Sequence, residues 1–404
     1  MINNKEANAM NMIDQIRIPL GVVLQFDDVG WDDGRDLRLN GLASRSGLPR
    51  HHALEDYRVL DKLGEAMNSK IAVALCLGDW DKDNFLRGVV GATHDPYGWD
   101  KASEIDVKKF EAYRDVMESS PFVEYTVHAL LHGNYDESGK RINESEGFNI
   151  WTDEDGVRHK EIVSDEYFLE HLDLFFKIYN SWGFKKDVNI YIAPSGMGGI
   201  TYEHMEHVTK LLYSRGIRYW TNSGFPFDLP VKVINGVACL KQNSEVRRMF
   251  NAPWNAYDLD PETFPQFLQE DGTKNSTNIG LHWTNLLRYN PKHNLEQVEP
   301  WADYFRRQDE VFGYMTAFDF KESVNQTIYH WNARIEASDD RFIIDLSNVD
   351  FDGFEPLERN FCVSLKKGVT PKECIGGSIA LHSVHNEFDT YRVEFNGTRV
   401  EILI

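Results

Sequence analysis

The stretch IPLGVVLQFDDVG, residues 18–30, decides the fold of this chain. It is a short run of apolar and β-branched residues that stops at two adjacent carboxylates, Asp27 and Asp28. Such a run is typical of a buried strand. Catalytic residues gather at the carboxyl ends of the strands in a parallel α/β sheet. The segment therefore predicts a first strand that ends at a functional edge, although a solvated turn or a helix cap would also explain two adjacent carboxylates.

Six further apolar runs and three helix-like patterns alternate after this strand. The runs are KIAVALCLG (70–78), PFVEYTVHALL (121–131), VNIYIAP (188–194), IRYWTNS (217–223), GVACLKQ (236–242) and NIGLHW (278–283). The helical patterns cover residues 53–67, 165–183 and 201–216, and the last two end in Gly183 and Gly216, a common helix stop. The alternation predicts an α/β fold, a distorted or incomplete (β/α) barrel of about seven strands.

The pattern of strand-like and helix-like segments changes after a polar helical region at about 294–331. Residues 332–404 carry short strand-like runs separated by turn residues, and Asn396-Gly397 between two alternating runs predicts a hairpin. We therefore expect two domains: a barrel over residues 1–331 and a small antiparallel β domain over residues 332–404.

The net charge and the absence of long apolar stretches limit which partners and which location we expect for this protein. The 404 residues include 64 acidic and 43 basic side chains, a net charge of −21, which disfavours nucleic acid and anionic membrane surfaces as partners. No apolar stretch is long enough for a membrane span, and the N-terminus lacks the apolar core of a secretory signal. The four cysteines are scattered. We expect a cytoplasmic protein, or a secreted one if a signal has been removed; the sequence does not indicate its oligomeric state.

Three histidines join the two carboxylates at predicted strand ends. His128 and His132 are four residues apart, a spacing that places both on one face of a helical turn, where they can converge on one metal ion. Ala129 excludes the H-E-x-x-H zinc protease motif. His282 lies near the end of the last apolar run, NIGLHW. Each histidine taken alone is more often packed or solvated. Together the residues supply one carboxylate and two imidazoles for a three-ligand metal site, with a second carboxylate and a third imidazole left for proton transfer.

These three segments resemble motifs of the NodB-type polysaccharide deacetylase superfamily. LQFDDVG (24–30) is similar to its first motif, T-F-D-D-G, and HALLH (128–132) is similar to its metal motif, H-(S/T)-x-x-H. IGLH (279–282) is similar to its late Leu-His motif. The order and the approximate separation also fit, and the resemblance covers about residues 18–290.

The resemblance implies a distorted (β/α) barrel and a metal-dependent hydrolase that removes N- or O-linked acetyl groups from a carbohydrate through a metal-bound water. By that resemblance, Asp27 would be the general base and His282 the general acid. Asp28, His128 and His132 would hold a divalent metal, most often zinc.

Two other motifs of that superfamily are altered here. The third is represented by YIAPSGMGG (191–199), which keeps Pro194 and the glycines but lacks the Arg that orients the base. A backbone N–H near this turn is expected to stabilise an oxyanion. The fourth motif has no clear match, since its nearest segment, YWTNSG (219–224), contains no Asp. We expect a divergent member with an unusual substrate.

Substrate contacts are predicted from aromatic residues near strand ends. The chain has ten tryptophans, and flat rings can stack on sugar faces. The predicted contacts are Trp80, Pro194, Trp220 and Trp283. Aromatic residues are more often part of a core than of a binding platform, so this alternative stays open.

Two other functions remain open. A glycoside hydrolase on a related barrel would use two suitably spaced carboxylates and would create new reducing ends without releasing acetate. A non-catalytic glycan-binding protein would bind sugar without turnover, with the C-terminal β domain used for adhesion or as structural support.

Overall fold

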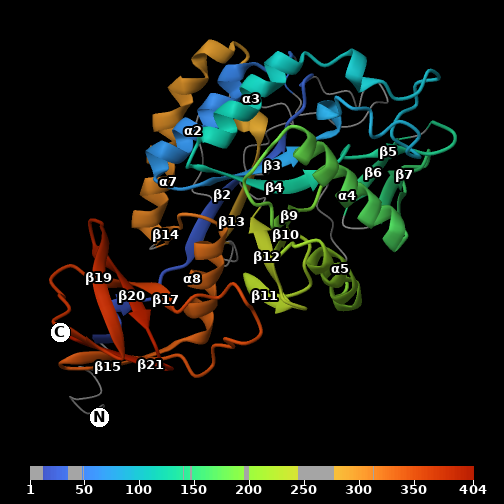
Figure 1. The fold of residues 1–404 in the computed structure, drawn as a ribbon. Coiled ribbons are helices and arrows are strands. Elements are labelled where there is room, and N and C mark those ends of the chain that lie inside the picture. The colour runs from blue at the N-terminus through green and yellow to red at the C-terminus, as the bar shows by residue number, and fades with distance from the viewer. Residues whose placement is uncertain are drawn as a thin grey trace. The chain divides into compact units, whose positions relative to one another are not determined.

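Seven parallel strands close into a barrel in the computed structural model, which describes residues 12–34, 48, 50–139, 141–145, 148–194, 200–243, 277–312 and 314–404 (Figure 1). The strands are β2 (Gly21–Val29), β3 (Ile71–Cys76), β4 (Val123–Ala129), β9 (Ile190–Ile192), β10 (Tyr219–Asn222), β12 (Val237–Asn243) and β13 (Asn278–His282). They pair in this order, β13 returns to β2, and every pairing is parallel. Each strand falls in one of the seven apolar runs, so the predicted fold class is confirmed.

Helices cover the outside of the barrel. They are α2 (Leu54–Met67), α3 (Val107–Ser119), α4 (Asp165–Ser181), α5 (Tyr202–Ser214) and α7 (Val298–Phe312). The three predicted helices are α2, α4 and α5, and Gly183 and Gly216 follow the last two with positive φ. Helix α3 was not predicted. The sequence does mark its start: Asp106 is the N-cap residue, and its side chain accepts a hydrogen bond from the backbone N–H of Lys109. Short 3₁₀ segments are η2 (Gly78–Trp80), η3 (Lys101–Ser103), η6 (Trp283–Asn285) and η7 (Pro291–Gln297).

An antiparallel sheet between β4 and α4 was not predicted. Its strands, in sheet order, are β5 (Asn134–Tyr135), β6 (Arg141–Ser145), β7 (Phe148–Thr152) and β8 (Arg158–Ile162). A further strand, β11 (Val231–Ile234), pairs antiparallel with β12.

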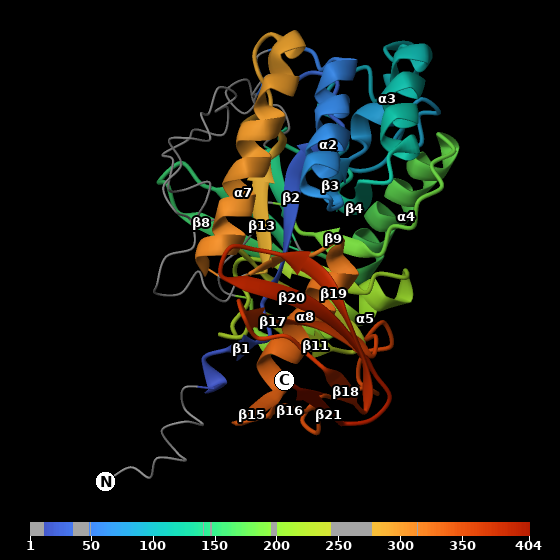
Figure 2. The same cartoon turned by 90° about the vertical axis from the view of Figure 1, so that its left-hand side faces the viewer.

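The chain packs into two compact units, one formed by residues 23–304 and the other by residues 1–22 and 305–404. The second unit holds two four-stranded antiparallel sheets, in the orders β1-β17-β20-β19 and β15-β16-β21-β18 (Figure 2). Its elements are β1 (Ile16–Arg17), β14 (Met315–Thr316), α8 (Phe320–Asn332), β15 (Arg334–Ser338), β16 (Arg341–Asp345), β17 (Asn360–Lys366), β18 (Glu373–Ile375), β19 (Gly377–Val384), β20 (Phe388–Phe395) and β21 (Arg399–Leu403). The predicted domain boundary after residue 331 stays a prediction.

The hairpin predicted at Asn396-Gly397 is wrong. Strand β20 before it pairs with β17 and β19, whereas β21 after it pairs with β16 and β18. The two strands therefore belong to different sheets, and the Asn-Gly pair links one sheet to the other. Alternating sequence identifies each strand, but the partners of each strand depend on which sheet buries its apolar face.

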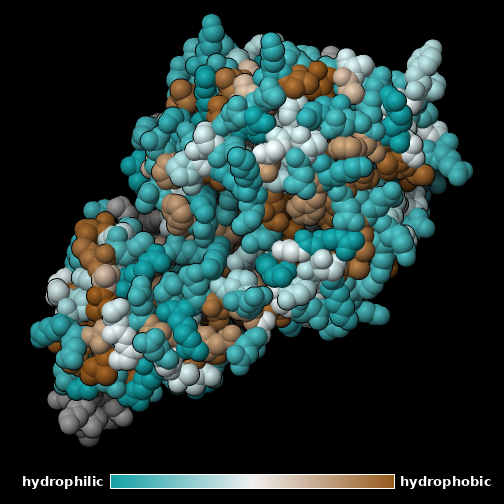
Figure 3. All heavy atoms as spheres, viewed as in Figure 1, coloured by the Kyte–Doolittle hydropathy of each residue, from teal (hydrophilic) through white to brown (hydrophobic). Residues whose placement is uncertain are grey.

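The face of the molecule drawn in Figure 3 is mostly hydrophilic, with apolar residues in separate patches. Isolated apolar side chains on a surface are normal in globular proteins. Within the described ranges, no helix is both long and apolar enough to span a bilayer.

A buried carboxylate, Asp56, braces the barrel unit near the start of α2. Arg50 donates two hydrogen bonds of 2.7 Å to it, one to each carboxylate oxygen, and Nδ1 of His52 lies 2.9 Å from Oδ2. The side chain of Asn294 and the backbone N–H of Ala53 also donate to Asp56. Arg50 additionally donates to three backbone carbonyls, those of residues 51, 288 and 289. One carboxylate thus connects the segment before α2 with the chain that follows β13.

We expect Asp56→Asn to lower the free energy of unfolding by about 3–5 kcal/mol, because it leaves the Arg50 charge without its buried counter-charge. Denaturant unfolding measures this loss. Glu55→Gln is the matched control. Glu55 forms an exposed pair with Arg58, so this variant should cost under about 1 kcal/mol. Equal losses in the two variants would contradict the role of Asp56 as a brace.

The same variant should show a characteristic pH dependence. Burial alone would raise the pKa of Asp56, but the hydrogen bonds and charges of Arg50 and His52 outweigh burial and hold it below the ordinary value. A carboxyl whose pKa is lower in the folded state stabilises the fold above its unfolded pKa, about 3.9, and loses this contribution as the pH falls further. The difference in unfolding free energy between wild type and Asp56→Asn should therefore be largest above about pH 5 and shrink below about pH 4. A difference that does not change with pH would contradict this assignment.

Candidate metal centre

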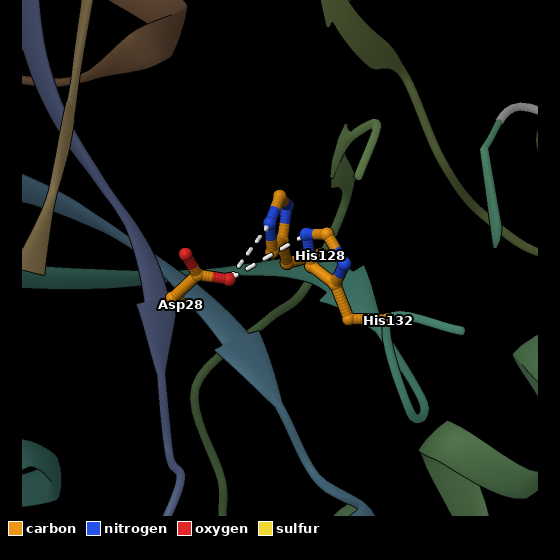
Figure 4. Close-up of side chains that lie close together, drawn as sticks. All are labelled: Asp28, His128 and His132. Atoms are coloured by element: carbon orange, nitrogen blue, oxygen red, sulfur yellow. Dashed lines mark ion pairs between the residues drawn. The ribbon is translucent and has the colours of Figure 1, made fainter. Parts of the chain in front are cut away.

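Asp28, His128 and His132 lie together at the carboxyl-terminal end of the barrel strands (Figure 4). Asp28 belongs to β2, His128 belongs to β4, and His132 follows β4 by three residues. Oδ1 of Asp28 lies 3.6 Å from Nε2 of each histidine. Figure 4 shows both imidazoles turned toward this carboxylate, and all three residues are buried. The structure thus brings together the three residues that the sequence proposed as metal ligands.

An irregularity in β2 lets two consecutive carboxylates reach the same end of the barrel. Neighbouring residues of a regular strand point to opposite faces of the sheet. The pairing of β2 with β3 shifts register between Phe26 and Val29, and Asp28 has φ +67°. An irregularity of this kind re-aims a side chain, and Asp tolerates the left-handed conformation better than most residues. Asp28 can therefore join Asp27 at the strand end instead of pointing toward the outer helices.

The two histidines do not converge through a helical turn, so that part of the prediction is wrong. His128 lies inside β4, and the chain leaves the strand at Leu130 as a bend. The backbone N–H of Gly78 donates to the carbonyl of Leu130 at 2.7 Å, and His132 has φ +58°. The chain therefore bends after the strand and has a left-handed residue at His132. This bend brings the imidazole of His132 next to that of His128.

The ring orientation of His128 is suited to metal binding. Its Nδ1 lies 2.8 Å from the backbone carbonyl of Ile192 on β9. A carbonyl only accepts hydrogen bonds, so Nδ1 carries a proton, and in the neutral ring Nε2 then keeps its lone pair. Histidine ligands in metal sites are commonly oriented in this way. The Nε2 atom with the lone pair is the one that faces Asp28.

The electrostatics favour a charged carboxylate at the centre. Burial alone would raise the pKa of Asp28, but contact with His128 and the charges of His132 and His282 outweigh burial, and the pKa lies below the ordinary value. For His128, burial lowers the pKa, whereas the contact with Asp28 and the charge of Asp27 raise it, with a net increase. Each group thus makes the charged form of the other more favourable.

The donor set fits a divalent cation. The three ligand atoms lie within 4.8 Å of one another, and Oδ1 of Asp28 is buried without a hydrogen-bond partner among the described residues. A separation of 3.6 Å is too long for a hydrogen bond. Ligand atoms about 2.0–2.1 Å from a tetrahedral zinc ion are themselves about 3.3 Å apart, close to the spacing here. One carboxylate and two imidazoles leave a fourth position open, as catalytic sites require.

Asp27 and His282, the predicted base and acid, lie at the same end of the barrel. They are directly paired in the register of β2 and β13. Nε2 of His282 lies 3.6 Å from Oδ2 of Asp28, the oxygen that does not face the other two histidines. Asp27 is buried and accepts a hydrogen bond from the side-chain amide of Gln25. A second carboxylate and a third imidazole therefore adjoin the three-ligand group without belonging to it.

The predicted tryptophan platforms are contradicted by their burial. Trp80, Trp220 and Trp283 are each 0% exposed, so none offers a ring face to a sugar. Trp80 packs against Phe110 and Trp182, Trp220 packs against Phe225, and Trp283 stacks on His52. These large apolar rings contribute to the packing between strands and helices.

The third-motif segment is described only in part. Pro194 is buried directly after β9. Residues 195–199, where we expected a backbone oxyanion donor, lie outside the described residues.

Sequence reasoning missed Gln25 and its neighbours in the barrel interior. Gln25 is two residues before Asp27 and therefore on the same face of β2, which was a usable signal. Its contacts to Thr221 and Asn278 join residues more than 190 positions apart in the chain, and no local pattern shows these.

Comparisons with known proteins do not place this chain in a family. No family model and no curated protein matches it. A solved structure described as an endogalactoceramidase aligns over 97% of this chain and 97% of its own, at 9% identity and a TM-score of 0.27. So low a similarity supports no argument about function.

We expect the purified protein to bind about one equivalent of a divalent metal, and His128→Ala or Asp28→Ala to lose it, because each removes one of three ligands. Metal analysis after dialysis measures the content. His293→Ala is the matched control, since His293 is exposed and forms only a surface pair with Glu296. Equal metal content in all four proteins would contradict the assignment.

Proposed function

We propose that this protein is a metal-dependent hydrolase that removes acetyl groups from a carbohydrate, as a divergent member of the NodB-type deacetylase superfamily. One observation carries the proposal: a buried group of one carboxylate and two imidazoles is flanked by a second carboxylate, Asp27, and a third imidazole, His282. Acyl hydrolysis needs an electrophile to polarise the carbonyl, a base for the attacking water and an acid for the leaving group. The five side chains offer these three functions in one place.

Asp28, His128 and His132 would hold the cation. When bound, a divalent ion in this position supplies a Lewis acid that polarises the acyl carbonyl and lowers the pKa of a coordinated water. The protein contributes a rigid, largely dry ligand set, because these side chains are buried and the ring of His128 is fixed by the Ile192 carbonyl.

Asp27 is the proposed general base. It lies next to a proposed ligand in the chain and beside the three-ligand group, where its carboxylate would take the proton of the attacking water. The hydrogen bond from Gln25 holds one of its oxygens. Two adjacent carboxylates in different surroundings can divide the roles of ligand and base.

His282 is the proposed general acid. Its Nε2 lies 3.6 Å from Oδ2 of Asp28, on the strand next to Asp27. From there its protonated ring would donate a proton to the departing amine or alcohol.

A neutral acetylated sugar suits this chain better than an anionic polymer. The net charge of −21 creates long-range repulsion toward polyuronates and similar substrates. Because the predicted tryptophan platforms are buried, sugar recognition has to come from other side chains.

We expect Asp27→Asn to reduce acetate release by at least about 10²-fold while metal content stays at the wild-type level, because removing a general base costs about 10²–10⁴ in rate. The assay measures acetate released from N-acetylated and O-acetylated oligosaccharides. Asp339→Asn is the matched control, since Asp339 belongs to another Asp-Asp pair and is exposed. Full activity of Asp27→Asn would exclude Asp27 as the base.

The same assay separates the competing functions. New reducing ends without acetate would indicate a glycoside hydrolase. Sugar binding without turnover in the metal-loaded protein would indicate a glycan-binding protein. Either result would overturn the proposed deacetylase activity.

A second prediction concerns His282. If it protonates the leaving group, His282→Gln should slow acetyl-sugar hydrolysis by about 10²-fold or more and slow 4-nitrophenyl acetate hydrolysis much less, because nitrophenolate departs without a proton. The ratio of the two rates measures this effect. An equal reduction for both substrates would assign His282 to another role.

A further inference from the structure

The geometry points to Gln25 as the residue that positions Asp27, in place of the Arg that the third motif lacks. This inference rests on the proposed function, because it concerns the base of that reaction. Gln25 is fully buried inside the barrel, within strand β2 and two residues before Asp27. Within the described residues its hydrogen bonds go to Asp27, Thr221 and Asn278 and to none of the three proposed ligands, so Asp27 is its contact with the reaction site.

The side chain of Gln25 connects three strands. Its Nε2 donates to Oδ1 of Asp27 on β2. Its Oε1 lies 2.7 Å from Nδ2 of Asn278 on β13 and 3.4 Å from Oγ1 of Thr221 on β10. All three partners are buried. The side-chain amide of Gln25 therefore links Asp27, the proposed base, to β10 and β13.

The direction of this chain of hydrogen bonds is set by chemistry. An ionised carboxylate only accepts hydrogen bonds, so the amide end that faces Asp27 has to be the donor, Nε2. The other end, Oε1, is then an acceptor and needs donors, which Asn278 and Thr221 supply. If the Gln25 amide were reversed, its oxygen would face the Asp27 carboxylate, and two acceptors would be in contact without a hydrogen bond. This arrangement thus favours one orientation of Gln25 and, with it, one position of the Asp27 oxygen.

Small residues flank this amide in the barrel. In the parallel register Gln25 lies between Ala72 of β3 and Gly280 of β13, and the side chain of a second glutamine, Gln242, occupies the space that a Cβ at Gly280 would need. Interiors of such barrels are dominated by bulky branched residues. Burying an amide is unfavourable unless its hydrogen bonds are satisfied. A polar layer directly beneath the carboxylates is therefore a costly feature, and holding the base explains it.

The mechanism differs from orientation by an arginine. A guanidinium fixes a carboxylate with a full positive charge, whereas an amide fixes it with a neutral hydrogen bond. Gln25 would hold the oxygen in place without adding a charge to the barrel interior.

The test replaces Gln25 by methionine, which has a similar length and no donor. We expect Gln25→Met to lower kcat for acetate release by about 10-fold or more, to change KM by less than about 2-fold, and to keep one metal per chain. Thr126→Val is the control. Thr126 has a buried hydroxyl two residues before His128, and this hydroxyl donates a long, 3.4 Å hydrogen bond to the carbonyl of Val73, so the kcat of the variant should match wild type.

A double-mutant cycle decides whether Gln25 acts through Asp27. Residues that act as a unit have non-additive effects, so Gln25→Met in the Asp27→Asn background should change the residual rate by less than about 2-fold. An unchanged kcat in the single variant, or the same reduction in both backgrounds, would overturn the inference.

Crystal structures separate failure of this inference from failure of the proposed function. In wild type the Gln25 amide should contact Oδ1 of Asp27, and in Gln25→Met the carboxylate should adopt a different or a mixed rotamer. If wild type releases no acetate from any substrate, the proposed function fails while the structures still test the positioning role. If the Asp27 rotamer is the same in both proteins, the positioning role is wrong whatever the activity.

Discussion

The backbone of β2 at Asp28 is the constraint on which the site depends. A regular strand would send Asp27 and Asp28 to opposite faces of the sheet, one into the barrel and one toward the helices. The register shift and the positive φ at Asp28 remove this alternation at the last residues of the strand. His132 has a left-handed backbone as well. Two of the three proposed ligands thus occupy a conformation that is uncommon for residues other than glycine, and such conformations persist where the surrounding structure requires them.

The rest of the site is built from the regular parts of the barrel. Parallel pairing places His282 beside Asp27, and the hydrogen bond between His128 and the Ile192 carbonyl links β4 to β9. Below the carboxylates, Gln25 contacts residues of two further strands. The regular strands make the site rigid, and the irregular backbone at their ends orients the side chains toward one another.

Much of the fold was predictable, for a local reason. Seven apolar runs correspond to the seven barrel strands, because a buried strand needs a short apolar sequence whatever its partners are. Candidate site residues could be named because Asp28, His128 and His282 lie at or near the ends of such runs. The prediction failed where non-local contacts decide, as at Asn396-Gly397, where the flanking strands join different sheets. It also failed for Trp80 and Trp220, because proximity to a strand end does not show which way a ring points.

The sequence by itself determined the seven barrel strands and three of the helices between them, the acidic charge and the residue types available for metal binding and proton transfer. Those properties follow from side-chain chemistry and from periodicity over a few residues. Only the tertiary structure decided that Asp28, His128 and His132 converge, that HALLH bends after a strand instead of forming a helical turn, and that Gln25 lies beneath the base. These relations join atoms from strands far apart in the chain, and they exist only once the barrel closes and fixes the register between neighbouring strands.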